Sequence, residues 1–292
     1  MLGSVVVDHT WQVDDIPQRP TKSTARGYSM GVGGLAANAA IAVARLGGRV
    51  AFWGRVGDDA NGPGVAEALA AEGIDVSGLR VCPGGRTAVS AVLVEPTGER
   101  ATISFRGAAL EIDPGWLPLD RLGEAGALLC DPRWPQASEL VLAAARQRGL
   151  PSVIDAERSE TRILHQLVPL VDHAIFSEPG LQNFAAGAPP AEGLRRALAM
   201  GTARLAAVTR GERGTLWLAA GTDKPRETPT FKVEARNTTG AGDVFHGAYA
   251  LAIAEGQPME QALRFASAAG ALRAEAGTTP HRAAVEAMLA RG

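Results

Sequence analysis

Short apolar runs alternate along the chain with longer segments in which apolar residues recur at helical spacing. The short runs are continuous rather than alternating, which is typical of buried strands in a parallel sheet covered on both faces. The predicted strands are Ser4–Val7, Val50–Trp53, Ala127–Cys130, Ser152–Ile154, His173–Phe176 and Leu205–Thr209. The predicted helices are Leu35–Leu46, Gly64–Ala71, Ala137–Arg148, Leu181–Ala186, Leu194–Met200, Ala241–Ala254, Met259–Ala274 and His281–Ala290. This alternation predicts a doubly wound α/β fold with a mostly parallel sheet.

Two regions interrupt the pattern. The segment Thr10–Met30 is polar and extended. The segments Thr87–Val94 and Ala101–Phe105 alternate apolar with polar or small residues, and the turn residues Pro96–Glu99 join them. The second region therefore predicts an antiparallel hairpin with one wet face.

The interrupting regions, about residues 10–32 and 86–107, are inserted between the first strand–helix units. We expect them to form a small sheet beside the carboxyl ends of the parallel strands, where a lid would lie. Neither a repeat nor a long linker occurs, so residues 1–292 are expected to form a single α/β domain.

Composition restricts the class of partner. The chain has 292 residues, of which 46% are hydrophobic, enough for a full core, and its net charge is −2. This balance gives no attraction for nucleic acid or an anionic membrane, so a small-molecule ligand is expected. The two cysteines, Cys82 and Cys130, are far apart, and no apolar run reaches the length of a membrane span. A cytoplasmic location is therefore predicted.

The first glycine cluster is Gly31–Asn38, at the start of a predicted helix. It matches the dinucleotide fingerprint only loosely, because no buried strand precedes it and no ribose-binding acid follows at the required distance. It could simply form a tight loop for close helix packing. Alternatively, it lets a polyhydroxy ligand approach the backbone, with the Asn38 amide as donor and acceptor.

The second cluster, Asn237–Asp243, follows the strand-like segment Phe231–Ala235 and starts a helix. Small residues at a helix start leave amide groups free to bind an anion. Asp243 would repel such an anion, unless the anion is a phosphoryl group in transfer and Asp243 takes the proton of the attacking hydroxyl. The alternative is an ordinary acidic residue in a first helical turn. The chain has no GxxxxGK[ST] loop and no protein-kinase motif set.

At these clusters the sequence resembles the ribokinase (PfkB) family of carbohydrate kinases, and the resemblance covers essentially the whole chain. It rests on the motifs GGLAANAA at Gly33–Ala40, GRVGDDANG at Gly54–Gly62, TGER at Thr97–Arg100, VTRGERG at Val208–Gly214 and NTTGAGD at Asn237–Asp243. The resemblance implies a ribokinase-like fold with a small β-sheet lid. It also implies transfer of the γ-phosphoryl of ATP to a sugar hydroxyl with Mg²⁺.

The resemblance also implies roles for individual residues. Asp243 matches the position of the family's catalytic base, and Gly240, Ala241 and Gly242 match the positions of its anion hole. The positions that hold sugar hydroxyls are Asp8, Gly33, Gly34 and Asn38. The positions that bind ATP are Thr209, Gly211, Gly214 and His281.

Within the family, the chain is most similar to 6-deoxy-6-sulfofructose kinases. The similarity rests on DPRWPQA at Asp131–Ala137, DHAIFSEPGL at Asp172–Leu181, GAGDVFHGAYA at Gly240–Ala250 and RFASAAGAL at Arg264–Leu272. It implies phosphorylation at O1 of a ketohexose with an anionic C6 group, which Arg133 and Lys22 would bind. Asn38 and Ser104 differ from the residues expected of that type, so ribokinase, fructokinase and 2-keto-3-deoxygluconate kinase activities stay open.

The resemblance implies a Mg²⁺-supporting role for Glu178, although the family's usual NxxE motif reads Ser177–Gly180 here. Asn237 stands where the family usually has Asp, and the lost charge argues against activation by K⁺. These departures also leave a non-catalytic sugar-binding sensor as an alternative from another class. A homodimer through the lid is expected, because an alternating hairpin has a second face and edges to cover.

Overall fold

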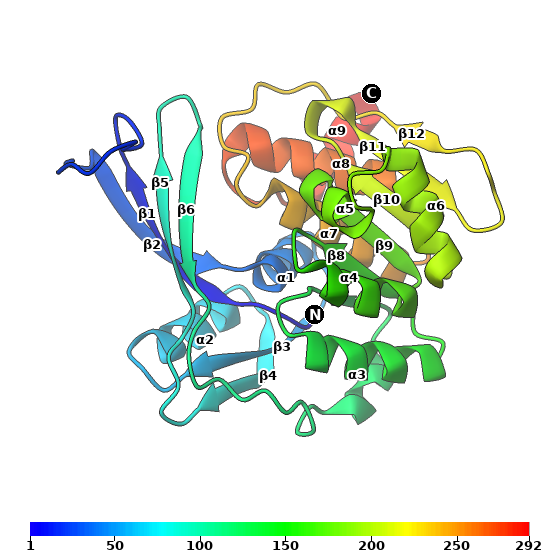
Figure 1. Cartoon of the computed structure of the whole chain (residues 1–292), viewed down its shortest axis with the longest axis horizontal. Helices are drawn as coiled ribbons and strands as arrows, with labels where there is room; N and C mark the ends of the chain where they lie inside the picture. The colour runs from blue at the N-terminus through cyan, green and yellow to red at the C-terminus, as the bar shows by residue number, and fades with distance from the viewer. Residues whose placement is uncertain (292) are drawn as a thin grey trace.

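Four of the six predicted apolar runs form the parallel strands of a central sheet in the computed structural model, which describes residues 1–291 (Figure 1). Its strands lie in the order β12-β11-β10-β9-β8-β7. The four parallel strands are β7 (Leu128–Cys130), β8 (Ser152–Ala156), β9 (His173–Ser177) and β10 (Leu205–Thr209). Two antiparallel strands, β11 (Thr215–Ala219) and β12 (Arg226–Thr228), complete one edge.

The predicted first strand, Ser4–Val7, is wrong as a member of this sheet. Only Leu2 bridges it, between Cys130 and Trp53. This single residue links the sheet to the parallel pair β3 (Ala51–Gly57) and β4 (Asp75–Cys82). The backbone amide and hydroxyl of Ser4 donate instead to Asp131, at 2.7 and 2.6 Å, so the chain leaves the ladder there.

Helices cover both faces of the central sheet, as the doubly wound prediction requires (Figure 1). Consecutive residues of one strand, such as Val153 and Ile154, belong to opposite apolar cores. One core contains helices α3 (Pro135–Gln147), α4 (Thr161–Leu167), α5 (Glu178–Phe184) and α6 (Pro190–Met200). The other contains α1 (Leu35–Arg45), α7 (Ala241–Ala254), α8 (Met259–Ala276) and α9 (Arg282–Arg291). Helix α2 (Asn61–Ala71) packs in a third core, and short 3₁₀ turns lie at Leu119–Glu124, Val168–Leu170 and Gly211–Arg213.

A second sheet of four strands stands at one side of the molecule, on the left in Figure 1. Its order is β2-β1-β5-β6, with bounds β2 (Gly27–Gly33), β1 (Val6–Gln12), β5 (Val89–Val94) and β6 (Arg100–Phe105). The β5–β6 pair confirms the predicted antiparallel hairpin. Asp8, Ser90 and Ser104 are cross-strand neighbours on one face of this sheet. Ile103 precedes Ser104 on β6, so its side chain belongs to the opposite face.

Other differences have local reasons. The strand-like segment Phe231–Ala235 forms no strand. Strand β4 was not predicted, because polar residues such as Arg80 interrupt its apolar pattern. Cys82 and Cys130 are both buried free thiols. Among residues 1–291, no helix combines the length and apolarity that crossing a membrane would need.

Candidate active site

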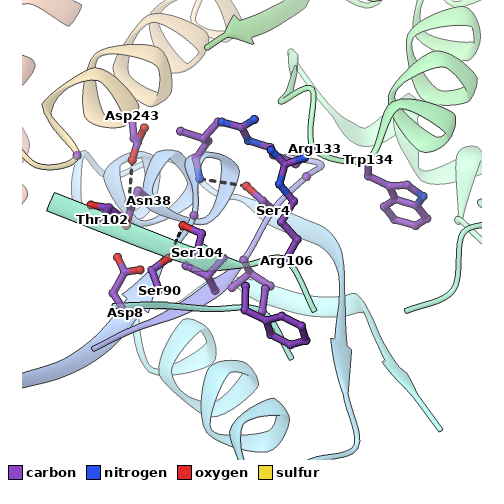
Figure 2. Close-up of a pocket in the computed structure, with 18 of the residues that line it drawn as sticks. Ser4, Asp8, Asn38, Ser90, Thr102, Ser104, Arg106, Arg133, Trp134 and Asp243 are labelled. Atoms are coloured by element: carbon purple, nitrogen blue, oxygen red, sulfur yellow. Dashed lines mark hydrogen bonds between the residues drawn. The ribbon is translucent and has the colours of Figure 1, made fainter. Parts of the chain in front are cut away.

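A cavity of about 320 Å³ lies between the four-stranded sheet and the N-terminal ends of α1 and α7 (Figure 2). Several predicted sugar-site and catalytic residues line it: Asp8, Gly34, Asn38, Arg133, Gly240 and Asp243. In Figure 2, Asp243, Asn38 and Asp8 lie on one side of the cavity, whereas Arg133 and Trp134 lie on the other. The cavity therefore has an acidic end and a basic end.

Asp243 is held in the first turn of α7 and is only 9% exposed. The side-chain amide of Asn38, on α1, donates to its carboxylate at 2.7 Å. Burial, and then the negative charge of Asp155, raise the pKa of Asp243 to about 7. A carboxylate with such a pKa can accept a proton at neutral pH, which is what a general base must do.

The loop before α7 ends at a left-handed glycine. Gly240 has φ of +72°, a left-handed conformation that favours glycine, and it is the cap of the helix. The side-chain oxygen of Asn237 accepts the Thr239 amide at 2.9 Å, which shapes the loop. The Ala241 amide donates to the Thr238 carbonyl at 3.2 Å, so of the three predicted anion-hole residues it is already partnered within the loop.

Asp8 is the second carboxylate of the cavity. It lies on β1, half-buried, and burial raises its pKa, while the Ser90 hydroxyl acts in the opposite direction. The predicted residue Gly33 lies directly behind it: a Cβ built on Gly33 would be 2.0 Å from Asp8 Oδ2. Gly33 therefore acts by making space for the carboxylate.

Asp131 is a positioning residue that the sequence reasoning missed. Its side chain is fully buried and accepts from the backbone amides of Ser4, Ala36 and Arg133. One carboxylate thus joins the end of β7 to the approach to β1, the start of α1 and the backbone of Arg133. An acid directly after a predicted buried strand was the available signal.

The basic end contains more arginine than the sequence reasoning predicted. Arg55 and Arg106 line the cavity together with Arg133. The Arg133 guanidinium donates to the Arg158 carbonyl at 3.0 Å. The Arg55 guanidinium lies 4.0 Å from the ring centroid of Trp134, which fixes its position. These residues come from β3, from the end of β6 and from the loop after β7, so no local motif shows their proximity.

A second cavity, of about 710 Å³, lies on the other side of the loop before α7. Five predicted residues line it: Thr209, Gly211, Gly214, Ala241 and Gly242. Its lining is mostly apolar, with Phe231, Phe245 and Ala271, and it also includes Arg100 and Thr238. A ligand with an apolar part and an anionic group fits this lining.

Four predicted residues do not line either cavity: Gly33, which lies behind Asp8, and Lys22, His281 and Glu178. Lys22 is exposed in the connection between β1 and β2. His281 is exposed just before α9, with Nδ1 3.3 Å from the Arg45 carbonyl oxygen. Glu178 begins α5 and forms an ion pair with Arg213, which belongs to the turn that follows β10. Their roles stay predictions.

The loop before α7 and the first turn of that helix, Thr238–Asp243, separate the two cavities: Thr239, Gly240 and Asp243 line the first, and Thr238, Ala241 and Gly242 line the second. A group could pass from one ligand to the other along this loop. A base faces the first cavity at that point, and helix-start amides are the groups that favour an anion. The arrangement suits transfer of a phosphoryl group to a hydroxyl.

Comparison with known proteins gives one consistent result. The model for "pfkB family carbohydrate kinase" matches residues 1–281. The ribokinase of Bacillus subtilis is 29% identical over 99% of this chain and 98% of its own length. A solved protein of Agrobacterium tumefaciens, described provisionally as a ribokinase, has a TM-score of 0.94 and 34% identity, covering 99% of this chain and 96% of the other. The ribokinase of Arabidopsis thaliana, solved with ribose and ATP, has a TM-score of 0.83 and 25% identity, covering 99% and 97%.

Proposed function

Because the chain belongs to the pfkB family of carbohydrate kinases, we propose that it transfers the γ-phosphoryl of ATP to a hydroxyl of an anionic sugar. The observation that carries the proposal is Asp243, buried with a raised pKa at the loop that divides the two cavities. The first cavity would hold the sugar and the second would hold ATP. The Arabidopsis ribokinase, which was solved with ribose and ATP, supports this pair of ligands.

In the proposed reaction, Asp243 takes the proton of the attacking sugar hydroxyl. The new bond joins the sugar oxygen to the γ-phosphorus, and the bond to the bridging oxygen breaks, so ADP leaves with that electron pair. Asn38 holds the carboxylate in place through its 2.7 Å hydrogen bond. Asp8, at the same side of the cavity, would accept hydrogen bonds from sugar hydroxyls and orient the ring.

We expect Mg²⁺ to bind mainly to the phosphates of ATP rather than to a set of protein side chains. Among residues 1–291, no cluster of three or more His, Cys, Asp or Glu side chains could hold a metal. Mg²⁺ usually binds through substrate phosphates, waters and one or two carboxylates. Glu178 would contact it through water. Mg²⁺ would neutralise charge on the phosphates.

The sugar that fits best is a ketohexose with an anionic group at C6, phosphorylated at O1, with 6-deoxy-6-sulfofructose as the specific candidate. Arg133 and Arg106 stand across the cavity from the base in Figure 2, and the Arg55 guanidinium packs on Trp134 at the same side. An anion bound there would leave the other end of the sugar near Asp243. Arginine binds sulfonate and phosphate oxygens well through its fork of donors. Ribokinase, fructokinase and 2-keto-3-deoxygluconate kinase activities are the alternatives.

A panel of sugars tests the substrate class. ADP formation would be measured with sulfofructose, fructose 6-phosphate, fructose, ribose and 2-keto-3-deoxygluconate. We expect the highest kcat/KM with an anionic ketohexose, and Arg133→Ala is expected to lower it by about tenfold or more through loss of a charge-assisted hydrogen bond.

The control for the panel is Arg162→Ala, because the Arg162 side chain is 82% exposed on α4, away from both cavities. Preference for a neutral sugar, or an Arg133→Ala variant that matches the parent on every anionic sugar, would overturn the substrate assignment. No ADP with any sugar of the panel would favour a sugar-binding sensor.

The proposed enzyme is a homodimer through the outer face of the four-stranded sheet. On that face Ile103 is 76% exposed, Met30 63%, Tyr28 57% and Phe105 46%. The register aligns Met30 and Ile103 in one row across the sheet, with His9 and Ala91 between them. Exposed apolar side chains gathered in this way are typical of an interaction surface.

Ile103→Lys is expected to convert the dimer to a monomer, because it buries a charge in the proposed interface. The mass in solution, measured by light scattering or analytical ultracentrifugation, would show the change. Ile112→Lys is the matched control, since Ile112 is also exposed, at 61%, but lies outside the sheet. A monomeric parent protein, or a dimer that survives Ile103→Lys, would contradict the proposed interface.

A further inference from the structure

An arginine from the four-stranded sheet reaches the loop that divides the two cavities. Arg100 begins β6, just after the hairpin turn. Its Nη1 donates to the hydroxyls of Thr238 and Thr239, 3.1 Å from each. Thr238 lines the second cavity and Thr239 lines the first, so the guanidinium lies at their junction. Arg100 itself lines the second cavity.

The hairpin turn lies near the residue that precedes Asn237. A Cβ built on Gly98 would lie 3.5 Å from the carbonyl oxygen of Arg236, and Gly98 has a positive φ. Figure 1 shows the tip of the β5–β6 hairpin beside the connection that leads to α7. The two hydrogen bonds to the threonine hydroxyls therefore place Arg100 where the hairpin turn approaches the connection to α7.

A second arginine approaches the loop from α8. The Arg273 guanidinium donates to the Asn237 carbonyl at 3.3 Å, and a Cβ built on Gly240 would lie 3.8 Å from its Nε and Nη2. Burial, and then the positive charges of Arg100 and Arg45, lower the pKa of Arg273, while Asp243 opposes the shift. Within residues 1–291, neither Arg100 nor Arg273 forms an ion pair with a carboxylate. The junction thus carries positive charge for which an anion is the natural partner.

We propose that Arg100 is a catalytic residue that contacts the phosphoryl group while it passes from ATP to the sugar. The inference deepens the proposed function and rests on it. The sugar oxygen–phosphorus bond forms, the bond to the ADP oxygen breaks, and the hydroxyl proton goes to Asp243, while Arg100 donates hydrogen bonds to the phosphoryl oxygens. The threonine hydroxyls hold the guanidinium at the junction before transfer. Because Arg100 belongs to the four-stranded sheet, transfer requires that sheet to lie against the loop.

The test compares Arg100→Ala, Arg100→Lys and Arg162→Ala on the sugar that the panel identifies. We expect Arg100→Ala to lower kcat by roughly 10–100-fold, the effect of a lost charge-assisted contact, with KM for the sugar changed less than threefold. Arg100→Lys should keep part of kcat, because it keeps the charge but not the fork. Added guanidinium ion at millimolar concentration should restore part of the activity of Arg100→Ala, and Arg162→Ala should behave as the parent.

An unchanged kcat in Arg100→Ala, or a loss confined to KM with no rescue by guanidinium, would overturn the inference. Equal thermal melting of parent and variants would show that the exposed substitutions leave the fold intact. The proposed function fails separately, if the parent protein forms no ADP with any sugar. If the parent is active and Arg100→Ala has the same kcat, only the proposed role of Arg100 would be refuted.

Discussion

Asp243→Asn is expected to lower kcat by at least about 10²-fold, because it removes the group that takes the proton of the sugar hydroxyl. The substitution keeps the shape of the side chain and an oxygen for the hydrogen bond from Asn38. Binding of sugar and ATP should therefore change little, so the loss should be in kcat rather than KM. Steady-state kinetics with the active sugar would measure it.

The pH dependence checks the same role by another route. Since the pKa of Asp243 is about 7, the base is protonated below that pH, and kcat/KM of the parent should fall about tenfold per pH unit under about pH 7. The raised pKa also means that the protonated form of Asp243 stabilises the folded protein relative to the ionised form. This contribution to stability is fully present below the unfolded pKa, near 3.8, and is lost as the pH rises through about 7.

The free energy of unfolding of Asp243→Asn should consequently exceed that of the parent by up to about 4 kcal/mol at pH 8. Near pH 3 the two proteins should have equal free energies of unfolding. This stability readout also shows that a lost activity is not a lost fold. Near-parental kcat in Asp243→Asn would refute the role of the base. A kcat/KM profile that stays flat between pH 5 and 8 would refute it as well.

Gly33→Ala is expected to lower kcat/KM for the sugar by about 10²-fold. The added methyl would lie 2.0 Å from Asp8 Oδ2 and 2.4 Å from its carboxyl carbon, so the carboxylate must leave its place. Asp8 would then lose its hydrogen bonds to sugar hydroxyls, and hydrogen bonds to a charged group contribute about 1.5–3 kcal/mol each. Kinetics at varied sugar concentration would place most of the loss in KM.

The matched control is Gly31→Ala on the same strand, because a Cβ built on Gly31 meets nothing within 4 Å. Neither glycine has a positive φ, so alanine brings no backbone strain at either position. We expect Gly31→Ala to retain parental kinetics. Equal behaviour of the two variants would show that the space behind Asp8 does not govern sugar binding.

The elements of the fold followed largely from local patterns. Leu205–Thr209 was predicted with its observed bounds, because a buried parallel strand is apolar throughout and needs no partner to be recognised. Ser4–Val7 was assigned to the wrong sheet. Its apolar pattern is equally suited to both sheets, and the hydrogen bonds between Ser4 and Asp131 decide where the chain leaves the ladder. A contact over 127 residues has no local signature.

The candidate site divides in the same way. The sequence by itself indicated the role of Asn237–Asp243, because small residues at a helix start and an acid in the first turn are local features of one short segment. The family followed from such segments as well, since each of the motifs is contiguous in the chain.

Only the tertiary structure decided what surrounds that loop. It brought Asn38 to Asp243 and Arg100 to Thr238, over 205 and 138 residues of sequence. It also gathered three arginines from separate parts of the chain at the far end of one cavity. It also raised the pKa of Asp243, because burial and the charge of Asp155 act through space. A motif made of neighbouring residues can be recognised in the sequence. The burial of a side chain, the charges around it and its contacts with distant residues depend on which elements the fold places together.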